Sequence, residues 1–188
     1  MTSDKRSAIL KATLKLISAN GFHGTAMSKV AKEAGVSAGI IYHYFDGKED
    51  LIDELYRQTK YDLSQALLRG YSMDEPIEDI FRHVWLNTLH YYMDHPKEMV
   101  FLEQYENSPY VKPETQAAYM GYFAPLVTFI QQGITDGHFK SMPEIMFSAL
   151  TIEVAMSLAK KHHSGMLKLD DALTEIVIEA CWDAVKAI

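Results

Sequence analysis

The chain has 188 residues, 48% of them apolar, so it is long enough and apolar enough to bury a sizeable core. Its formal net charge of −7 argues against a protein that coats nucleic acid without sequence preference. The single cysteine, Cys181, excludes an internal disulfide and fits a reducing compartment, so we expect a cytoplasmic protein.

Residues 25–51 predict two short helices, a tight turn between them and the start of a longer helix. The first helix has a compact apolar face, made by Val30, Ala31 and Ala34. Gly35 follows it, where the chain needs a positive φ, and Ser37 is placed to cap the second helix with its hydroxyl. Two helices joined by so short a turn favour a helix-turn-helix element, whose second helix lies in the major groove of DNA.

Residues 7–55 resemble the TetR family of bacterial transcription regulators. The positions that carry the resemblance stand in one register: Ile9, Leu10, Ala12, Gly21, Phe22, Thr25, Val30, Ala31, Ala34, Gly35, Val36, Ser37, Gly39, Tyr42, Phe45, Lys48 and Leu51. The resemblance implies an all-α chain with a DNA-binding head of three helices. A long helix would join this head, residues 1–48, to a ligand-binding and dimerisation body, residues 49–188. Repression is the usual mode of this family, and no cofactor is implied.

The second short helix supplies most of the candidate DNA contacts. By helical spacing one exposed edge is expected to hold Ser37, Ala38, Tyr42 and His43. A tyrosine hydroxyl and an imidazole suit phosphate oxygens or base edges, although Tyr42 could instead pack against Phe45. Gly39 would let the backbone approach DNA closely, unless it only relieves crowding against the preceding helix.

Two further DNA contacts are expected near the helix starts. Residues 46–49 have the spacing of a capping box for the long helix, with Glu49 reaching back to Asp46. Lys48 stands where the helix dipole opposes a positive charge, so a DNA phosphate explains its position better than solvent does. The resemblance implies the same phosphate contact for Lys48, and one for Thr25 at the start of the first short helix.

The charges divide in the same way as the expected domains. Residues 1–48 carry seven basic and three acidic side chains, a net charge of +4, which leaves −11 for the remainder. A basic head on an acidic body would orient the chain on DNA, although many proteins show such an imbalance by chance.

Beyond the head, every periodic stretch is helical. One helix is expected from Ile77 to Tyr91, another opens at Pro96, and a third runs from about Glu114 to Asp136, with Gly137 ending it. No apolar stretch is long enough for a signal peptide or a membrane span, so no membrane association is expected.

The middle of the chain is rich in aromatic residues. Residues 71–129 hold 12 of the 21 aromatic side chains, from Tyr71 to Phe129. Such side chains suit a pocket for a small but bulky apolar or amphipathic effector, although each of them could equally be a core residue. The preferred ligand contacts are Trp85, Tyr92, Phe101, Tyr105 and Phe123.

The last two predicted helices carry more apolar surface than one core can cover. Their stripes favour a four-helix bundle between two copies of the chain, with an interface made by Ile145, Ala149, Ile152, Met156, Leu173, Ile176, Val177 and Ala180. The alternative is that both stripes complete the core of the single chain. A homodimer is preferred because the two helix-turn-helix elements of a dimer bind two half-sites of DNA at a fixed spacing, which sets the position of the protein on the operator.

Two other function classes are alternatives to a DNA-binding regulator. A helical metalloenzyme would use Asp79, His83 and His90, but the chain has no Glu-x-x-His pair and no other catalytic constellation, so no enzyme and no metal site are expected. A helical interaction module would bind a protein partner through the head. The preferred hypothesis is a regulator that binds double-stranded operator DNA and is released by the effector.

Overall fold

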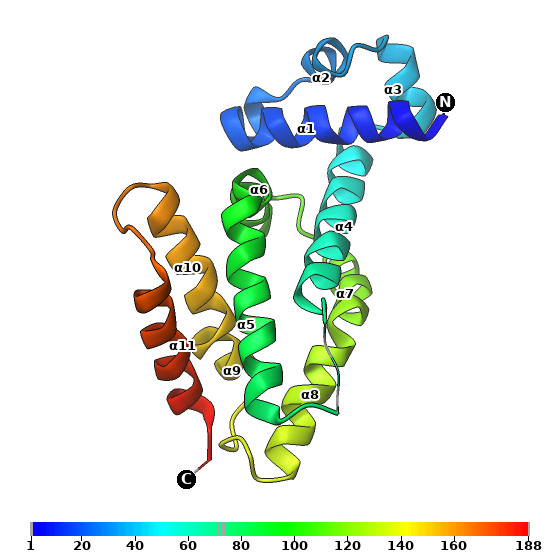
Figure 1. Cartoon of the computed structure of the whole chain (residues 1–188). Helices are drawn as coiled ribbons and strands as arrows, with labels where there is room; N and C mark the ends of the chain where they lie inside the picture. Colours follow the sequence, from blue (N-terminus) through cyan, green and yellow to red (C-terminus); the bar gives the residue numbers. More distant parts are fainter. Residues whose placement is uncertain (1, 71, 73, 188) are drawn as a thin grey trace. The chain divides into compact units, whose positions relative to one another are not determined.

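The computed structural model describes residues 2–70, 72 and 74–187, apart from the side chains of residues 2, 3 and 116–118. Tyr71, counted above among the aromatic residues, lies outside them. The described chain forms helices and no strand beyond one isolated antiparallel bridge between Phe139 and Lys186, which confirms the all-α prediction (Figure 1).

The helices form two compact units. Unit 1 holds Met1–Tyr61 and Lys97–Tyr119, and unit 2 holds Asp62–Pro96 and Met120–Ile188. Compact units need not coincide with functional domains, so the boundary expected between residues 48 and 49 stays a prediction.

Unit 1 contains the helix-turn-helix element. Its helices are α1 (Thr2–Gly24), α2 (Met27–Ala34), α3 (Ala38–Tyr44), the larger part of α4 (Lys48–Leu67), nearly all of α6 (Pro96–Glu106) and most of α7 (Pro113–Met120). α2 and α3 both pack against α1 (Figure 1). Ile9, Val30, Ile41 and Phe45 lie in the core of this arrangement, because short helices need a shared apolar core to persist in water.

The turn between α2 and α3 follows the sequence pattern only in part. Gly35 has φ 66°, the left-handed conformation expected after α2. Ser37 occupies the N-cap position of α3, but its side chain makes no capping hydrogen bond within the described chain, which corrects the predicted hydroxyl cap. At α4, the carboxylate that accepts from the Asp46 backbone amide belongs to Asp50, at 3.0 Å, and not to Glu49.

Unit 2 is built on α5 (Ile77–Asp94). Its other elements are the 3-10 helix η1 (Gly121–Phe123), α8 (Ala124–Thr135), α9 (Glu144–Leu150), α10 (Ile152–His163) and α11 (Asp171–Val185). α10 and α11 lie along α5, and α11 also contacts α9 (Figure 1). None of the helices in the described ranges combines the length and the apolar character needed to cross a membrane.

Two helices expected to be continuous are interrupted. The helix predicted from Glu114 to Asp136 is divided into α7, η1 and α8, and Pro125 stands in the first turn of α8, where proline is tolerated. The predicted helix that carries Ile145, Ala149, Ile152 and Met156 is divided into α9 and α10 at Thr151, which has φ −131° and ψ −78°. The carbonyl oxygen of Thr151 accepts a hydrogen bond from the buried Trp85 indole N–H at 3.2 Å. The carbonyl group at the break between the two helices therefore has a hydrogen-bond partner in the core.

Phe139, in the segment between α8 and α9, packs against α8. A Cβ atom on Gly133 would lie 2.3 Å from the Phe139 ring, so that ring packs directly on the backbone of α8. Two backbone hydrogen bonds, Lys140 N–H to Val185 O and Ala187 N–H to His138 O, both 2.8 Å, attach the segment around Phe139 to the end of α11.

Candidate functional site

The outward edge of α3 is the candidate DNA-reading surface. Its exposed residues are Ser37, Ala38, Gly39, Tyr42 and His43. Ile41 points the other way and is completely buried, so core packing fixes which edge of α3 faces out. Tyr42 is 57% exposed, whereas Phe45 is buried with its ring beside the Arg6 guanidinium and the Tyr44 ring. Tyr42 is therefore a surface residue and not a core packing residue.

Gly39 lies on this edge with open space around it. A Cβ atom built there would meet only the Ser37 hydroxyl oxygen, at 4.0 Å. The chain therefore gives no steric reason for a glycine at this position, and relief of crowding against α2 does not explain it.

The other two predicted DNA contacts, Thr25 and Lys48, have partners inside unit 1. The Thr25 hydroxyl donates to the Gly21 carbonyl oxygen at 2.9 Å, and the residue is only 2% exposed. The Lys48 ammonium donates to the Phe22 carbonyl oxygen at 2.6 Å, and partial burial lowers the pKa of Lys48. Both side chains hold the end of α1 in place, and their contacts to DNA stay predictions.

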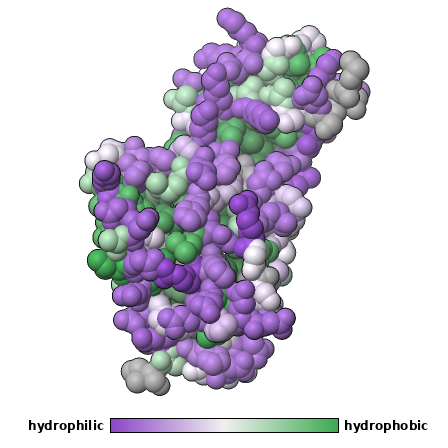
Figure 2. Space-filling model, viewed as in Figure 1, coloured by the Kyte–Doolittle hydropathy of each residue, from purple (hydrophilic) through white to green (hydrophobic). Residues whose placement is uncertain are grey.

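The residues proposed for the dimer interface are not buried within the single chain. Ile145, 75% exposed, Ile176, 62% exposed, Ala149 and Ala180 face outward, and Ile152, Met156, Leu173 and Val177 are half-buried. Figure 2 shows hydrophobic atoms gathered over α10 and α11 on the viewed face. Three further apolar residues that the sequence analysis did not assign to the interface, Met146, Leu150 and Met166, are also exposed.

The five aromatic residues chosen as ligand contacts are not brought together within one unit. Trp85, Tyr92 and Phe123 belong to unit 2, and Phe101 and Tyr105 belong to unit 1. Trp85, Phe101 and Tyr105 are completely buried.

The Tyr105 ring stacks on Tyr56, with ring centroids 4.0 Å apart, and its hydroxyl donates to Asp53 at 3.1 Å. Burial and the Asp53 carboxylate raise the pKa of Tyr105 above its ordinary value. These contacts are those of core residues, and a ligand role for the five residues stays a prediction.

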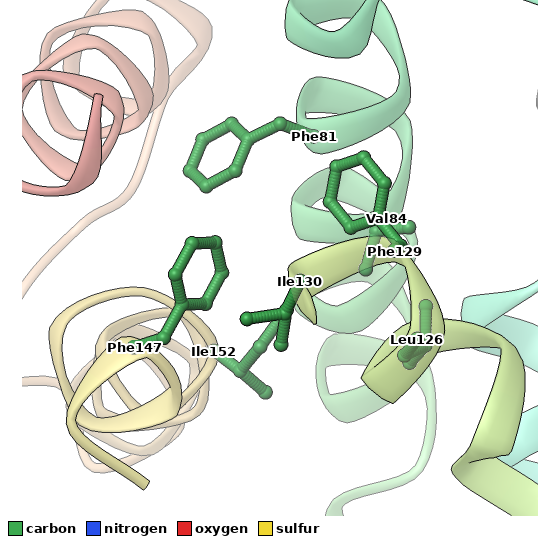
Figure 3. A pocket seen from close by; sticks show the side chains of 7 residues that line it. All are labelled: Phe81, Val84, Leu126, Phe129, Ile130, Phe147 and Ile152. Carbon is green, nitrogen blue, oxygen red and sulfur yellow. The ribbon is translucent and has the colours of Figure 1, made fainter. Parts of the chain in front are cut away.

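Unit 2 contains a small apolar cavity that sequence reasoning missed (Figure 3). It is lined by Phe81 and Val84 of α5, Leu126, Phe129 and Ile130 of α8, Phe147 of α9 and Ile152 of α10. Its empty volume is about 310 Å³, including the part open to solvent. None of the five predicted ligand contacts lines it. The spacing along each helix gives no signal for it, because the cavity exists only where four helices meet.

The structure does not support a metal site at the candidate ligands Asp79, His83 and His90. His83 Nδ1 lies 3.0 Å from a Glu75 carboxylate oxygen. Across the described residues, no group of three or more His, Cys, Asp or Glu side chains is placed to hold a metal ion.

Comparisons with known proteins agree with this geometry. Residues 9–55 match the family model described as bacterial regulatory proteins, tetR family, and residues 76–186 match the tetracyclin repressor-like C-terminal domain. An HTH-type transcriptional regulator of Haemophilus influenzae is 26% identical over 184 residues, which cover 98% of this chain and 97% of that protein.

Solved structures show the same likeness over nearly the whole chain. A TetR family transcriptional regulator from Vibrio parahaemolyticus is 34% identical with a TM-score of 0.88, over 98% of this chain and all (100%) of that one. A TetR family regulator from Marinobacter aquaeolei VT8 is 25% identical with a TM-score of 0.94, over 99% of this chain and 97% of that one.

Proposed function

Since the chain belongs to the TetR family of bacterial transcription regulators, we propose that it is a repressor that a small apolar or amphipathic effector releases from operator DNA. DNA-binding regulation is the function of the family, and its members are not enzymes. Repression, release by an effector and a homodimeric state go beyond membership of the family and are what we propose for this chain.

The open space around Gly39 carries the proposal. A glycine on an exposed helix lowers helix stability, so an external reason for it is needed where the chain supplies none. A DNA backbone or base edge that approaches α3 closely is such a reason, because a side chain at this position would hold the helix away from the groove.

The neighbouring residues then take distinct roles. Tyr42 and His43 donate to phosphate oxygens or base edges, Ser37 donates to a phosphate, and the Ala38 methyl group contacts the base surface. Lys48 has three N–H donors, of which Phe22 uses one, so the others remain available for a phosphate. Thr25 contributes by holding the end of α1, because its hydroxyl donates to the Gly21 carbonyl oxygen and its backbone N–H donates to the Phe22 carbonyl oxygen.

A homodimer fits the exposed apolar residues of α9 to α11. Pairing these surfaces in two chains would remove Ile145 and Ile176 from water. Two copies of α3 could then read half-sites about 34–36 Å apart, one turn of the DNA helix.

Effector binding in the body would act through the long helix α4, which begins in unit 1 and ends in unit 2. If the effector binds preferentially when the two reading helices are wrongly spaced, operator affinity falls. A coupling free energy of ~1–3 kcal/mol corresponds to a change of roughly 5- to 150-fold.

Fluorescence anisotropy tests the DNA-binding part, with DNA from upstream of the protein's own gene compared with a random duplex at one fixed salt concentration. We expect a preference of about 10³-fold or more for the upstream DNA. Tyr42→Ala should abolish it, whereas Tyr61→Ala, the same change at another exposed tyrosine, should not.

Equal weak binding to both duplexes, followed by failure of a genome-wide selection for bound DNA, would contradict the proposal. A head that binds a protein partner would then take its place.

A further inference from the structure

We propose that Ala38 determines specificity by recognising thymine: its methyl group contacts the C5-methyl group of one thymine in each operator half-site. At this position α3 distinguishes bases by the presence of that methyl group and not by hydrogen bonds. Because the inference names the base that the DNA-reading helix recognises, it rests on the function proposed above.

The side chains of α3 lack the groups that identify the other bases by paired hydrogen bonds. In the major groove, arginine or lysine pairs with guanine, asparagine or glutamine with adenine, and aspartate or glutamate with cytosine. Between Ala38 and Tyr44 none of these residue types occurs. Thymine is the base that presents an apolar group in the major groove, its C5-methyl. The composition of α3 therefore favours an apolar contact with thymine.

Exposure selects Ala38 from the aliphatic residues of α3. Ile41 is completely buried and Ile40 is half-buried, whereas Ala38 is exposed. Ala38 stands four residues before Tyr42, so the two side chains lie on the same outward edge of the helix. The other exposed side chains of this edge carry hydroxyl or imidazole groups, or are absent at Gly39. Ala38 therefore supplies the aliphatic group of the DNA-reading surface.

Gly39 explains how so short a side chain can reach a base. A methyl group extends little beyond the helix backbone, so it contacts a base only where the backbone itself comes close. A Cβ atom on Gly39 would meet only the Ser37 hydroxyl oxygen, at 4.0 Å, so no side chain at that position holds α3 away from the bases. Gly39 permits the close approach, and the methyl group of Ala38 makes the contact.

The thymine is located by selecting bound duplexes from a random pool and then replacing the thymines of the selected half-site one at a time by deoxyuracil. Uracil differs from thymine only in lacking the C5-methyl group. We expect one replacement per half-site to lower affinity about fourfold, the contribution of one buried methyl group. Fluorescence anisotropy with the full chain at one fixed salt concentration measures the change.

Four base pairs at this position separate the methyl group from the hydrogen-bond pattern: thymine·adenine, uracil·adenine, 5-methylcytosine·guanine and cytosine·guanine. Thymine and 5-methylcytosine carry the same C5-methyl group, but thymine presents the O4 acceptor where the cytosine base presents the N4 donor. We expect affinity to follow the methyl group. The two methylated pairs should bind alike, and about fourfold more tightly than the other two.

A matched pair of variants assigns the contact to Ala38. Ala38→Gly removes the methyl group from the protein, so the difference between thymine and uracil at this position should disappear. Ala19→Gly, the same change at an exposed residue of α1, should keep the difference. The Tm of each variant shows whether it is folded. If Ala38→Gly does not fold, the four base pairs tested on the unsubstituted protein decide alone.

Affinity that follows the base pair, or that is equal for all four pairs, would overturn the inference. A methyl effect that persists at full size in a folded Ala38→Gly protein would also overturn it, because the contact would then belong to another residue. In each of these cases the protein still prefers its operator, so the proposed function stands. A selection that yields no preferred duplex would instead overturn the proposed function, and this inference with it.

Discussion

The Lys48 ammonium donates a hydrogen bond to the Phe22 carbonyl oxygen at 2.6 Å and so ties the first turn of α4 to the end of α1. One side chain thereby connects two helices of the DNA-binding unit, 26 residues apart in sequence. Loss of DNA binding in a Lys48 variant has two physical explanations, a lost phosphate contact or a displaced helix, and the salt dependence of binding separates them.

Lys48→Gln should reduce the slope of log K against log salt concentration by about 0.9 if Lys48 neutralises one phosphate. It should also lower the free energy of unfolding by about 1 kcal/mol through loss of the charged hydrogen bond at a partly exposed site. Anisotropy titrations at several salt concentrations and urea unfolding measure the two effects. A lower stability with an unchanged slope would make Lys48 purely structural.

Ile176→Glu should dissociate the dimer and leave the single chain folded, because Ile176 is exposed in the chain and only a partner copy would bury it. Ile178→Glu, two residues away but buried, should instead unfold the chain. Sedimentation velocity and circular dichroism distinguish these outcomes, and Tyr61→Glu controls for added surface charge. A dimer that survives Ile176→Glu unchanged would place the interface elsewhere.

Gly133→Ala should lower the free energy of unfolding by about 1–3 kcal/mol, although alanine normally stabilises a helix. The added methyl carbon would lie 2.3 Å from the Phe139 ring. Gly121→Ala is the matched control, because a Cβ atom there meets nothing within 4 Å. Equal stability of the two variants in thermal unfolding would show that Phe139 moves aside without cost.

Cys181 should react slowly with thiol reagents in the native protein. The residue is buried, and burial raises the pKa of its thiol, so little reactive thiolate forms at neutral pH. Labelling with an aromatic disulfide should be at least about a hundredfold faster in denaturant than in its absence. Rapid labelling of the folded protein would indicate that α11 opens locally.

The helix-turn-helix element was predictable because its signals are local. Gly35 stands one residue after α2, and the apolar residues of α2 and α3 recur at helical spacing. The same helical spacing predicted which edge of α3 is exposed. The carboxylate that caps α4 was misassigned by one residue, Glu49 for Asp50, because both are acidic and stand in the first turn.

Features that depend on distant residues were not predictable. Apolar residues recur at helical spacing both before and after Thr151, so the sequence pattern predicts one helix where the structure has α9 and α10. The Thr151 carbonyl oxygen at the break is bound by Trp85, which lies 66 residues earlier in the sequence. Likewise, the sequence does not show that Phe129 of α8 lines the cavity of unit 2, because its place there depends on residues of α5, α9 and α10. Aromatic residues in a core and aromatic residues that line a cavity recur at the same helical spacing. They differ in whether the neighbouring helices fill the space beside the ring.

The operator affinity of Gly39→Leu, measured together with its Tm, tests the central claim most directly. The open space around Gly39 predicts a Tm that is unchanged or higher, since leucine is favoured over glycine in helices by up to about 1 kcal/mol. Operator affinity should nevertheless fall at least about tenfold, ~1.4 kcal/mol, because the side chain obstructs the approach of α3 to DNA. Gly121→Leu, also in open space but in unit 2, should bind normally. A folded Gly39→Leu protein that binds its operator as tightly as the unsubstituted chain would contradict the assignment of α3 as the DNA-reading helix.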